Sequence, residues 1–257
     1  MNKFLNLLQF LTRIRVKKNL KYDENMGSSM IYFPVVGIVI GIVLIAIYEV
    51  SNYFFSTDEL SILIAILIVL VEVMLTGGLH IDGFGDTFDG LFSYRPKDRI
   101  LEIMKDPTMG TNGILAITFL IIIKLSGVYL AINTDIIWAI FSMPVVGRLS
   151  ALIMSYKSVS ARPKGMGELF IGKCNLANLL GAIAITVVTV FVSCFVISND
   201  LLTSSKAVLG VAVSILVSIL IRRESYKKID GLTGDILGCS IEMGEIVFII
   251  FTLLVMS

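Results

Sequence analysis

Seven long apolar segments, separated by short polar stretches, run through the 257-residue sequence. A helix needs about 20 predominantly apolar residues to cross the hydrocarbon core of a bilayer. Hydrophobic residues make up 56% of the chain and charged residues 16%, which is more apolar surface than a soluble domain of this length could bury. The pattern therefore predicts an all-α, polytopic transmembrane helical bundle in one domain, residues 1–257. The predicted spans are residues 31–50, 61–79, 111–132, 136–156, 178–198, 207–222 and 244–257, the last being short and therefore tilted, kinked or partly interfacial.

Lysine and arginine residues are distributed unevenly among the loops that join these segments. Of the 21, 18 lie before residue 31 or in the loops after the second, fourth and sixth segments. The opposite loops contain only Lys206, while Lys124 and Arg148 lie within segments. Because short loops rich in lysine and arginine stay in the cytoplasm, we expect a multi-pass protein of the cell (inner) membrane. Its N-terminus and all three long loops would face the cytoplasm.

The N-terminal residues form an amphipathic pattern. Apolar side chains recur at helical spacing, with charged and amide side chains between them, over residues 4–14. This predicts a helix that lies in the plane of the cytoplasmic leaflet or packs against the bundle, and the pattern fits both equally. Without a small-residue cleavage site, we interpret it as part of the mature protein rather than a signal peptide.

The overall charge and the cysteines exclude several classes of partner. The net charge is +1, so there is no basic field that would attract nucleic acid. Cys174, Cys194 and Cys239 are widely separated, which argues against a disulfide framework or a structural zinc site. The expected surroundings are the lipid bilayer.

An acidic, glycine-rich stretch follows the second segment. Gly77 and Gly78 weaken a helix and permit close backbone approach. Asp82, Asp86 and Asp89 come next at i, i+4 and i+7, so a helix would place all three carboxylates on one face. Mg²⁺ suits such a face, because it takes carboxylate oxygens together with substrate phosphates. We favour a metal site over a solvated acidic helix end.

His80 is the only histidine and lies inside this stretch. An imidazole can act as a general base at neutral pH. A histidine at a helix end that caps a backbone carbonyl is the simpler interpretation, and we prefer it, with catalysis as the alternative.

Two further loops carry cations that could bind phosphate. Lys105 and Asp106 precede a loop broken by proline and glycine, where they could hold a phosphate and a metal-bound water, although an amphipathic helix with a proline stop explains them equally simply. Arg162 and Lys164 lie among small residues in the loop after the fourth segment. They could bind phosphate or simply lie at the membrane surface.

The stretch after the sixth segment is interpreted as a glycine-rich loop. Gly231 and Gly234 would offer free backbone N–H groups to a phosphate, and Asp235 adds a carboxylate. Glu242 follows as a further candidate metal ligand. Ionisable residues within spans are costly and are either functional or paired.

Within the spans we expect one ion pair, between Glu72 and Lys124. At the cytoplasmic face, carboxylates for Mg²⁺, cations for phosphate and glycines for close approach together favour phosphoryl transfer. The residues alone thus indicate a Mg²⁺-dependent transferase at the membrane face, with no particular substrate.

Several of these stretches together resemble the cobalamin synthase family, the adenosylcobinamide-GDP ribazoletransferases. The matching stretches run in order from residue 9 to about 245: QFLTRI at 9–14, FPVVG at 33–37, GGLHIDGFGDTFDG at 77–90, LEIMKD at 101–106, GTNG at 110–113, GR at 147–148 and GLTGD at 231–235, with Gly238 and Glu242. The chain departs from the family's usual residues at 84–85, 107–109 and in the loop at 161–165, and no acidic motif residue is lost.

The resemblance implies a reaction and roles. The 3′-hydroxyl of α-ribazole, or of its 5′-phosphate, would attack the cobinamide-side phosphorus of adenosylcobinamide-GDP, giving adenosylcobalamin or its 5′-phosphate and GMP. Mg²⁺ would be held by Asp82, Asp86 and Asp89. Asp235 would complete the metal shell or accept the hydroxyl proton, with His80 a less favoured base. The remaining candidates are Asp106 and Glu242 as further metal ligands, and Lys105, Arg162, Lys164, Gly231 and Gly234 as phosphate-binding residues. A homo-oligomer, or association with other cobamide-assembly enzymes, is left open.

Two other classes remain as alternatives. A CDP-alcohol phosphotransferase also uses aspartates at helical spacing in a membrane bundle, but its Asp-Gly-x-x-Ala-Arg signature is missing here, as is the Asp-Asp-x-x-Asp pattern of prenyl transferases. In a transporter, Glu72, Lys124 and Arg148 would line a substrate path. The clustering of polar motifs on one side argues against it, because alternating access needs a site near the midplane.

Overall fold

The computed structural model describes residues 2–16, 26–54, 60–162 and 165–256, and these are almost entirely helical. Within these ranges there is no β-strand, only an isolated bridge between Ser160 and Leu232. The helices are α1 (Asn2–Leu11), η1 (Met26–Tyr32), α2 (Phe33–Phe54), α3 (Ser61–Thr76), α4 (Leu79–Leu91), α5 (Lys97–Ile103), α6 (Thr111–Asn133), α7 (Ile137–Ser155), η3 (Met166–Leu169), α8 (Leu176–Ser198), α9 (Leu201–Ile229) and α10 (Gly234–Met256), where η marks a 3₁₀ helix.

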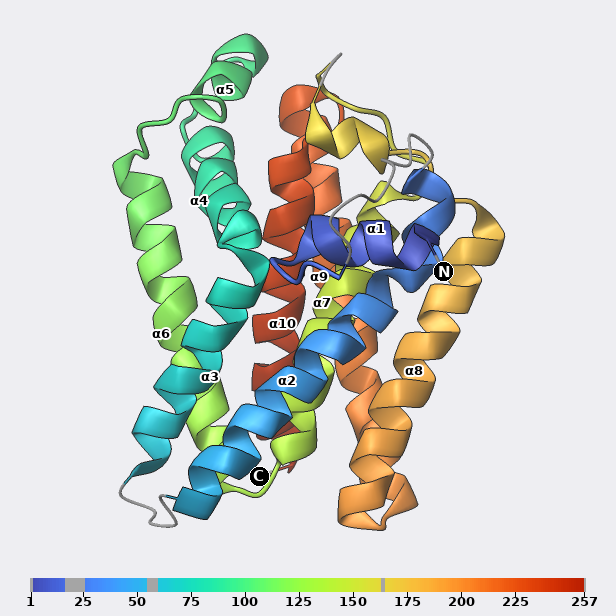
Figure 1. Ribbon diagram of the computed structural model, residues 1–257. Coiled ribbons are helices and arrows are strands. Elements are labelled where there is room, and N and C mark those ends of the chain that lie inside the picture. The colour runs from blue at the N-terminus through green and yellow to red at the C-terminus, as the bar shows by residue number, and fades with distance from the viewer. Residues whose placement is uncertain (1, 17–25, 55–59, 163–164, 257) are drawn as a thin grey trace.

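Six of the described helices are long and apolar enough to cross a membrane: α2 with the turn before it, α6, α7, α8, α9 and α10. The pair α3 and α4 makes a seventh candidate, bent by 88° at the break between them. These helices run along one another, and α7 lies almost wholly buried among α2, α8, α9 and α10 (Figure 1). The predicted all-α, polytopic bundle is confirmed.

The break between α3 and α4 corrects one predicted span. We expected a continuous segment over 61–79, but α3 ends at Thr76 after 16 residues. Gly77 and Gly78 have φ angles of 65° and 72°, a region that residues with a β-carbon rarely adopt. The double glycine therefore lets the chain turn sharply into α4, whose helix carries the three aspartates as expected.

The start of α10 corrects a second prediction. The stretch interpreted as a glycine-rich loop becomes helical at Gly234, ten residues before the predicted span. Thr233 caps this helix, because its hydroxyl oxygen accepts a hydrogen bond from the N–H of Ile236 at 3.3 Å. Asp235 therefore lies in the first turn of a 23-residue helix rather than in a loop. The span predicted at 207–222 is likewise only part of α9, which has 29 residues.

The N-terminal helix packs against the bundle. Leu7, Leu8 and Leu11 are buried, and α1 lies across the bundle beside the start of α2 (Figure 1). The helix ends at Leu11, so Ile14, the last residue of the predicted amphipathic pattern, lies outside it. Of the two interpretations of this segment, the structure shows the packed one.

A group of five charged side chains lies buried between the helices. Lys124 Nζ is 3.3 Å from Glu72, 2.6 Å from Glu242 and 2.5 Å from Glu245, and Arg148 also pairs with Glu245. The expected Glu72–Lys124 pair is thus confirmed as part of a larger set, which we call the buried ion cluster. Because unpaired charge is costly in an apolar interior, the cluster fixes α3, α6, α7 and α10 relative to one another.

Candidate active site

Helices α4 and α10 cross at two glycines. A β-carbon on Gly83 would lie 2.8 Å from the carbonyl oxygen of Asp235, and one on Gly238 would lie 3.3 Å from the α-carbon of His80. The two helices can approach this closely only because these positions lack side chains. The crossing brings Asp82, which follows the bend, next to Asp235 at the start of α10.

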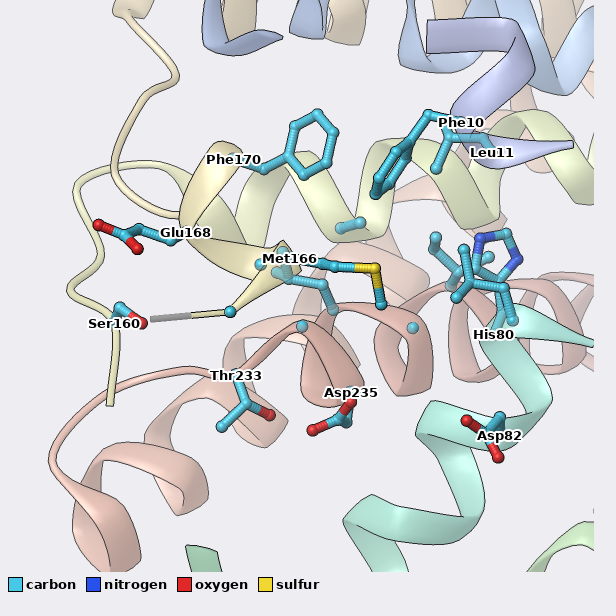
Figure 2. Close-up of a pocket in the computed structure, with 18 of the residues that line it drawn as sticks. Phe10, Leu11, His80, Asp82, Ser160, Met166, Glu168, Phe170, Thr233 and Asp235 are labelled. Atoms are coloured by element: carbon cyan, nitrogen blue, oxygen red, sulfur yellow. The ribbon is translucent and has the colours of Figure 1, made fainter. Parts of the chain in front are cut away.

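A cavity of about 340 Å³ lies beside this crossing. Helices α1, α2, α4, α7 and α10 and the segment after α7 all contribute to its wall. Figure 2 shows the carboxylates of Asp82 and Asp235 on one side of it, with Phe10 and Phe170 on the other. We call it the crossing cavity. The predicted site residues that line it are His80, Asp82, Lys105, Arg162, Gly234 and Asp235.

The carboxylates at the crossing are only partly neutralised. Asp86, one turn after Asp82, is half-buried and experiences the negative charges of Asp235, Asp82 and Asp89 together with the positive charge of Arg162. Arg162 Nη1 lies 3.1 Å from Asp235 Oδ2. We call Asp82, Asp86 and Asp235 the crossing carboxylates, and among the described residues Arg162 is their one ion-pair partner.

Two of the three predicted phosphate-binding cations line the cavity. Lys105 is exposed and lines the cavity from the start of the segment that follows α5. Arg162 is held on a second side by the carbonyl oxygen of Leu101, 3.4 Å from Nη2, and its Nε is buried without a hydrogen-bond partner among the described residues. Nη1 and Nη2 each carry a second N–H, which can donate to a substrate phosphate. Lys164 lies outside the described residues.

His80 does not act as the expected cap. The side chain is 2% exposed, and neither ring nitrogen has a hydrogen-bond partner among the described residues. Its imidazole lies on the cavity wall (Figure 2). The preferred interpretation, a histidine bonded to a backbone carbonyl, is therefore wrong.

The comparisons with known proteins decide the family. The model of the cobalamin-5-phosphate synthase family matches residues 3–253. The chain belongs to this family. It is 44% identical over 252 residues to the adenosylcobinamide-GDP ribazoletransferase of Clostridioides difficile (strain 630), covering 98% of this chain and 96% of that relative. It is 41% identical to the enzyme of the same name from Alkaliphilus metalliredigens (strain QYMF), over 99% of this chain and 96% of the relative. No solved structure matches the chain.

In this member of the cobalamin-5-phosphate synthase family, Asp89 has different neighbours from Asp82 and Asp86. Its carboxylate accepts hydrogen bonds from the N–H groups of Gly110 at 2.5 Å and Gly113 at 2.8 Å, at the start of α6. Carboxylates are favourable at helix N-termini, where N–H groups lack partners. The arrangement assigns Asp89 to anchoring α6 on α4.

Asp106 and Glu242, two further predicted metal ligands, also have other partners. Asp106 is exposed, and hydrogen bonds from the Thr108 hydroxyl and N–H hold the pKa of its carboxyl below the usual value. Glu242 belongs to the buried ion cluster. Among the described residues, no three His, Cys, Asp or Glu side chains converge to hold a metal ion by themselves.

The two predicted phosphate-binding glycines separate as well. Gly234 lines the crossing cavity, beside Gly167. Gly231 instead packs against the segment after α7, where a β-carbon would lie 2.7 Å from the carbonyl oxygen of Val159. The adjacent Leu232 exchanges backbone hydrogen bonds with Val159 and Ala161. Gly231 therefore permits the contact that holds this segment over the cavity.

Sequence reasoning missed the aromatic wall of the cavity. The rings of Phe10 and Phe33 lie 5.1 Å and 5.4 Å from that of Phe170, and all three residues line the cavity. Phe10 and Phe33 belong to two of the stretches that match the family, which was the available signal. Phe170 carried none, because a single phenylalanine in a membrane protein is unremarkable.

Proposed function

We propose that the crossing cavity is the active site in which this chain joins adenosylcobinamide-GDP to α-ribazole, or to α-ribazole 5′-phosphate. The product is adenosylcobalamin or its 5′-phosphate, and GMP is released. Family membership and the names of the relatives support the reaction. The observation that carries the placement is the glycine crossing of α4 and α10, which brings Asp82 and Asp235 together on one side of a cavity with cations around it.

In the proposed reaction, the 3′-oxygen of the acceptor ribose forms a bond to the cobinamide-side phosphorus, and the bond from this phosphorus to the bridging oxygen breaks. GMP leaves with that oxygen. Asp235 accepts the hydroxyl proton; it is 26% exposed and its partner Arg162 is 14% exposed, so both can meet a substrate. Arg162 and Lys105 bind the phosphate oxygens of the donor. His80, buried on the cavity wall, is the alternative base.

The donor set of the crossing suits Mg²⁺ bound jointly with substrate. Mg²⁺ usually takes one or two carboxylates together with substrate phosphates rather than an all-protein cage. Asp82 and Asp86 supply two carboxylates one helical turn apart, and Asp235 lines the same cavity as Asp82. When bound, Mg²⁺ supplies charge neutralisation for the departing phosphate. Asp82 and Asp86 are the proposed ligands. Asp235 both contacts the metal and accepts the hydroxyl proton.

The aromatic wall is proposed to hold the base of the acceptor. Phe10 and Phe170 present rings across the cavity from the carboxylates (Figure 2), and the ring of Phe33 packs against that of Phe170. Aromatic rings bind flat heterocycles by offset or edge-to-face contact, which contributes about 0.5–1.5 kcal/mol beyond the buried area. Such a wall also excludes water from the reacting phosphate.

We further propose that the cavity faces the cytoplasm from the inner membrane. The cavity is lined by residues of the segment after α7 and of the start of α10, and these segments lie at the same end of the bundle as α5 and the end of α9 (Figure 1). These are the loops in which lysine and arginine are concentrated, and such loops stay in the cytoplasm.

The test is a synthesis assay on membranes that carry the protein. Adenosylcobinamide-GDP and α-ribazole are supplied with Mg²⁺ or with excess chelator, and GMP and corrinoid product are followed by chromatography. We expect both products in equal amounts, with Mg²⁺ only. A well-folded protein that forms neither product would contradict the proposal and would call for a panel of CDP-alcohol substrates.

A further inference from the structure

Two more cavities adjoin the crossing cavity, and Arg13 lines both. One, of about 480 Å³, lies at the bend between α3 and α4 and shares Asp82 with the crossing cavity. The other, of about 470 Å³, shares Phe10 and Met166 with it and is also lined by Arg15. We call them the Arg13 cavities. Arg13 has no role in the proposed function, although it lies within one of the stretches that match the family.

The backbone and the bend hold Arg13 in place. Its N–H donates a hydrogen bond of 2.6 Å to the carbonyl oxygen of Leu75 at the end of α3. Its guanidinium lies where a β-carbon on Gly77 would be, 2.1 Å from Nε. The missing side chain at Gly77 therefore serves two purposes: it permits the bend and it makes room for the guanidinium. Among the described residues, Arg13 has no carboxylate within ion-pair distance.

The surroundings of Arg13 favour an anion. Helix α4 begins at Leu79, just after the bend, and the first N–H groups of a helix lack backbone partners. They carry partial positive charge. Gly78 has nothing within 4 Å of where its β-carbon would be, so this helix end is open. In the cavity at the bend, the guanidinium of Arg13 and the open helix N-terminus together match a phosphate group, while Arg15 lines only the other Arg13 cavity.

We infer that Arg13 binds the 5′-phosphate of the acceptor nucleotide and so makes α-ribazole 5′-phosphate a better acceptor than α-ribazole. The inference rests on the proposed function. The attacking 3′-hydroxyl and the 5′-phosphate belong to one ribose, so the phosphate must lie close to the carboxylates that receive the hydroxyl. Arg13 and Asp82 line the same cavity, whereas Arg162 and Lys105 line the crossing cavity and bind the donor.

The experiment compares the two acceptors in the purified full-length protein. Values of kcat/KM are measured with adenosylcobinamide-GDP and either acceptor for wild type, Arg13→Gln and Arg13→Lys. The matched control is Arg223→Gln, an exposed arginine of α9 outside these cavities. In Arg13→Gln the preference for the phosphorylated acceptor should fall about 10- to 100-fold, since a hydrogen bond to a charged group contributes about 1.5–3 kcal/mol. Arg13→Lys keeps the charge without the bidentate geometry, so its preference for the phosphorylated acceptor should lie between those of wild type and Arg13→Gln.

A lipid phosphate is the other source of the same chemistry, and a second arm separates it. The proteins are reconstituted in phosphatidylcholine vesicles with and without phosphatidylglycerol. If the variant changes the response to the anionic lipid while the acceptor preference stays as in wild type, Arg13 binds lipid and the inference is overturned. An equal loss with both acceptors, or no loss, overturns it too. Wild type inactive with both acceptors would instead contradict the proposed function.

Discussion

The buried ion cluster and the crossing carboxylates both depend on α10, yet their charge is balanced in different ways. In the cluster, Glu245 is 1% exposed and contacts both Lys124 and Arg148. At the crossing, Asp235 is 26% exposed and its described ion-pair partner is Arg162 alone. Where the interior is sealed, the protein supplies the countercharges itself. Where the helix opens to a cavity, part of the countercharge is left to come from a ligand.

The largest expected effect is at the crossing carboxylates, where α10 opens to the cavity. Asp82→Asn keeps the size of the side chain but removes its charge. We expect transfer to fall by about 100- to 10,000-fold, the range for loss of a group that acts at the reacting atoms, while thermal stability stays near wild type. The measurement is kcat with saturating donor. Asp98→Asn, an exposed aspartate of α5, is the control and should remain active; near-normal turnover of Asp82→Asn would remove it from the site.

In the buried ion cluster, the expected effect of a substitution is on folding. Lys124→Met leaves three buried carboxylates without their shared ammonium, and breaking a buried ion pair costs about 3–5 kcal/mol. We expect a marked fall in the thermal midpoint of the detergent-solubilised protein. Lys206→Met, half-buried in the N-terminal part of α9, should change little. Adding Glu242→Gln to Lys124→Met should restore part of the loss, and an unchanged midpoint in the single variant would contradict the pairing.

The glycine crossing offers a smaller and more local test. Gly83→Ala places a β-carbon 2.8 Å from the backbone of Asp235, so α4 and α10 must move apart. Because a displacement of about 1 Å can cost 100-fold in rate, we expect a 10- to 100-fold loss of kcat with only modest destabilisation. Gly85→Ala is the matched control, since its β-carbon meets the flexible ends of Met109 and Ile117. Equal activity of the two variants would show that the close approach is not needed.

The smallest expected effect concerns Asp89. Asp89→Asn keeps only one oxygen acceptor, so the N–H of either Gly110 or Gly113 loses its partner, and the charge at the start of α6 is lost. We expect a stability loss of about 0.5–2 kcal/mol and turnover within several-fold of wild type. Thermal midpoints and kcat are measured beside Asp82→Asn. If Asp89→Asn were as inactive as Asp82→Asn, the separation of an anchoring aspartate from the crossing carboxylates would fail.

The sequence predicted the helical bundle and the main acidic motif because both depend on local patterns. Apolar runs locate most spans, and the i, i+4, i+7 spacing placed three aspartates on one helix. It missed the early start of α10, because Asp235, Glu242 and Glu245 lower the hydropathy of a helix whose charges find partners only in the folded bundle. It also grouped Asp89 with Asp82, since spacing along one helix cannot show that Gly110 and Gly113 meet only one of them.

The most direct measurement is the binding of Mn²⁺, which suits the same oxygen ligands as Mg²⁺, followed by electron paramagnetic resonance. We expect weak binding to the protein alone and much tighter binding once adenosylcobinamide-GDP is present, because substrate phosphates complete the coordination. This gain should disappear in Asp82→Asn and persist in Asp106→Asn. Equally tight binding without donor, or a gain that survives Asp82→Asn, would contradict the proposed metal-binding role of the crossing carboxylates.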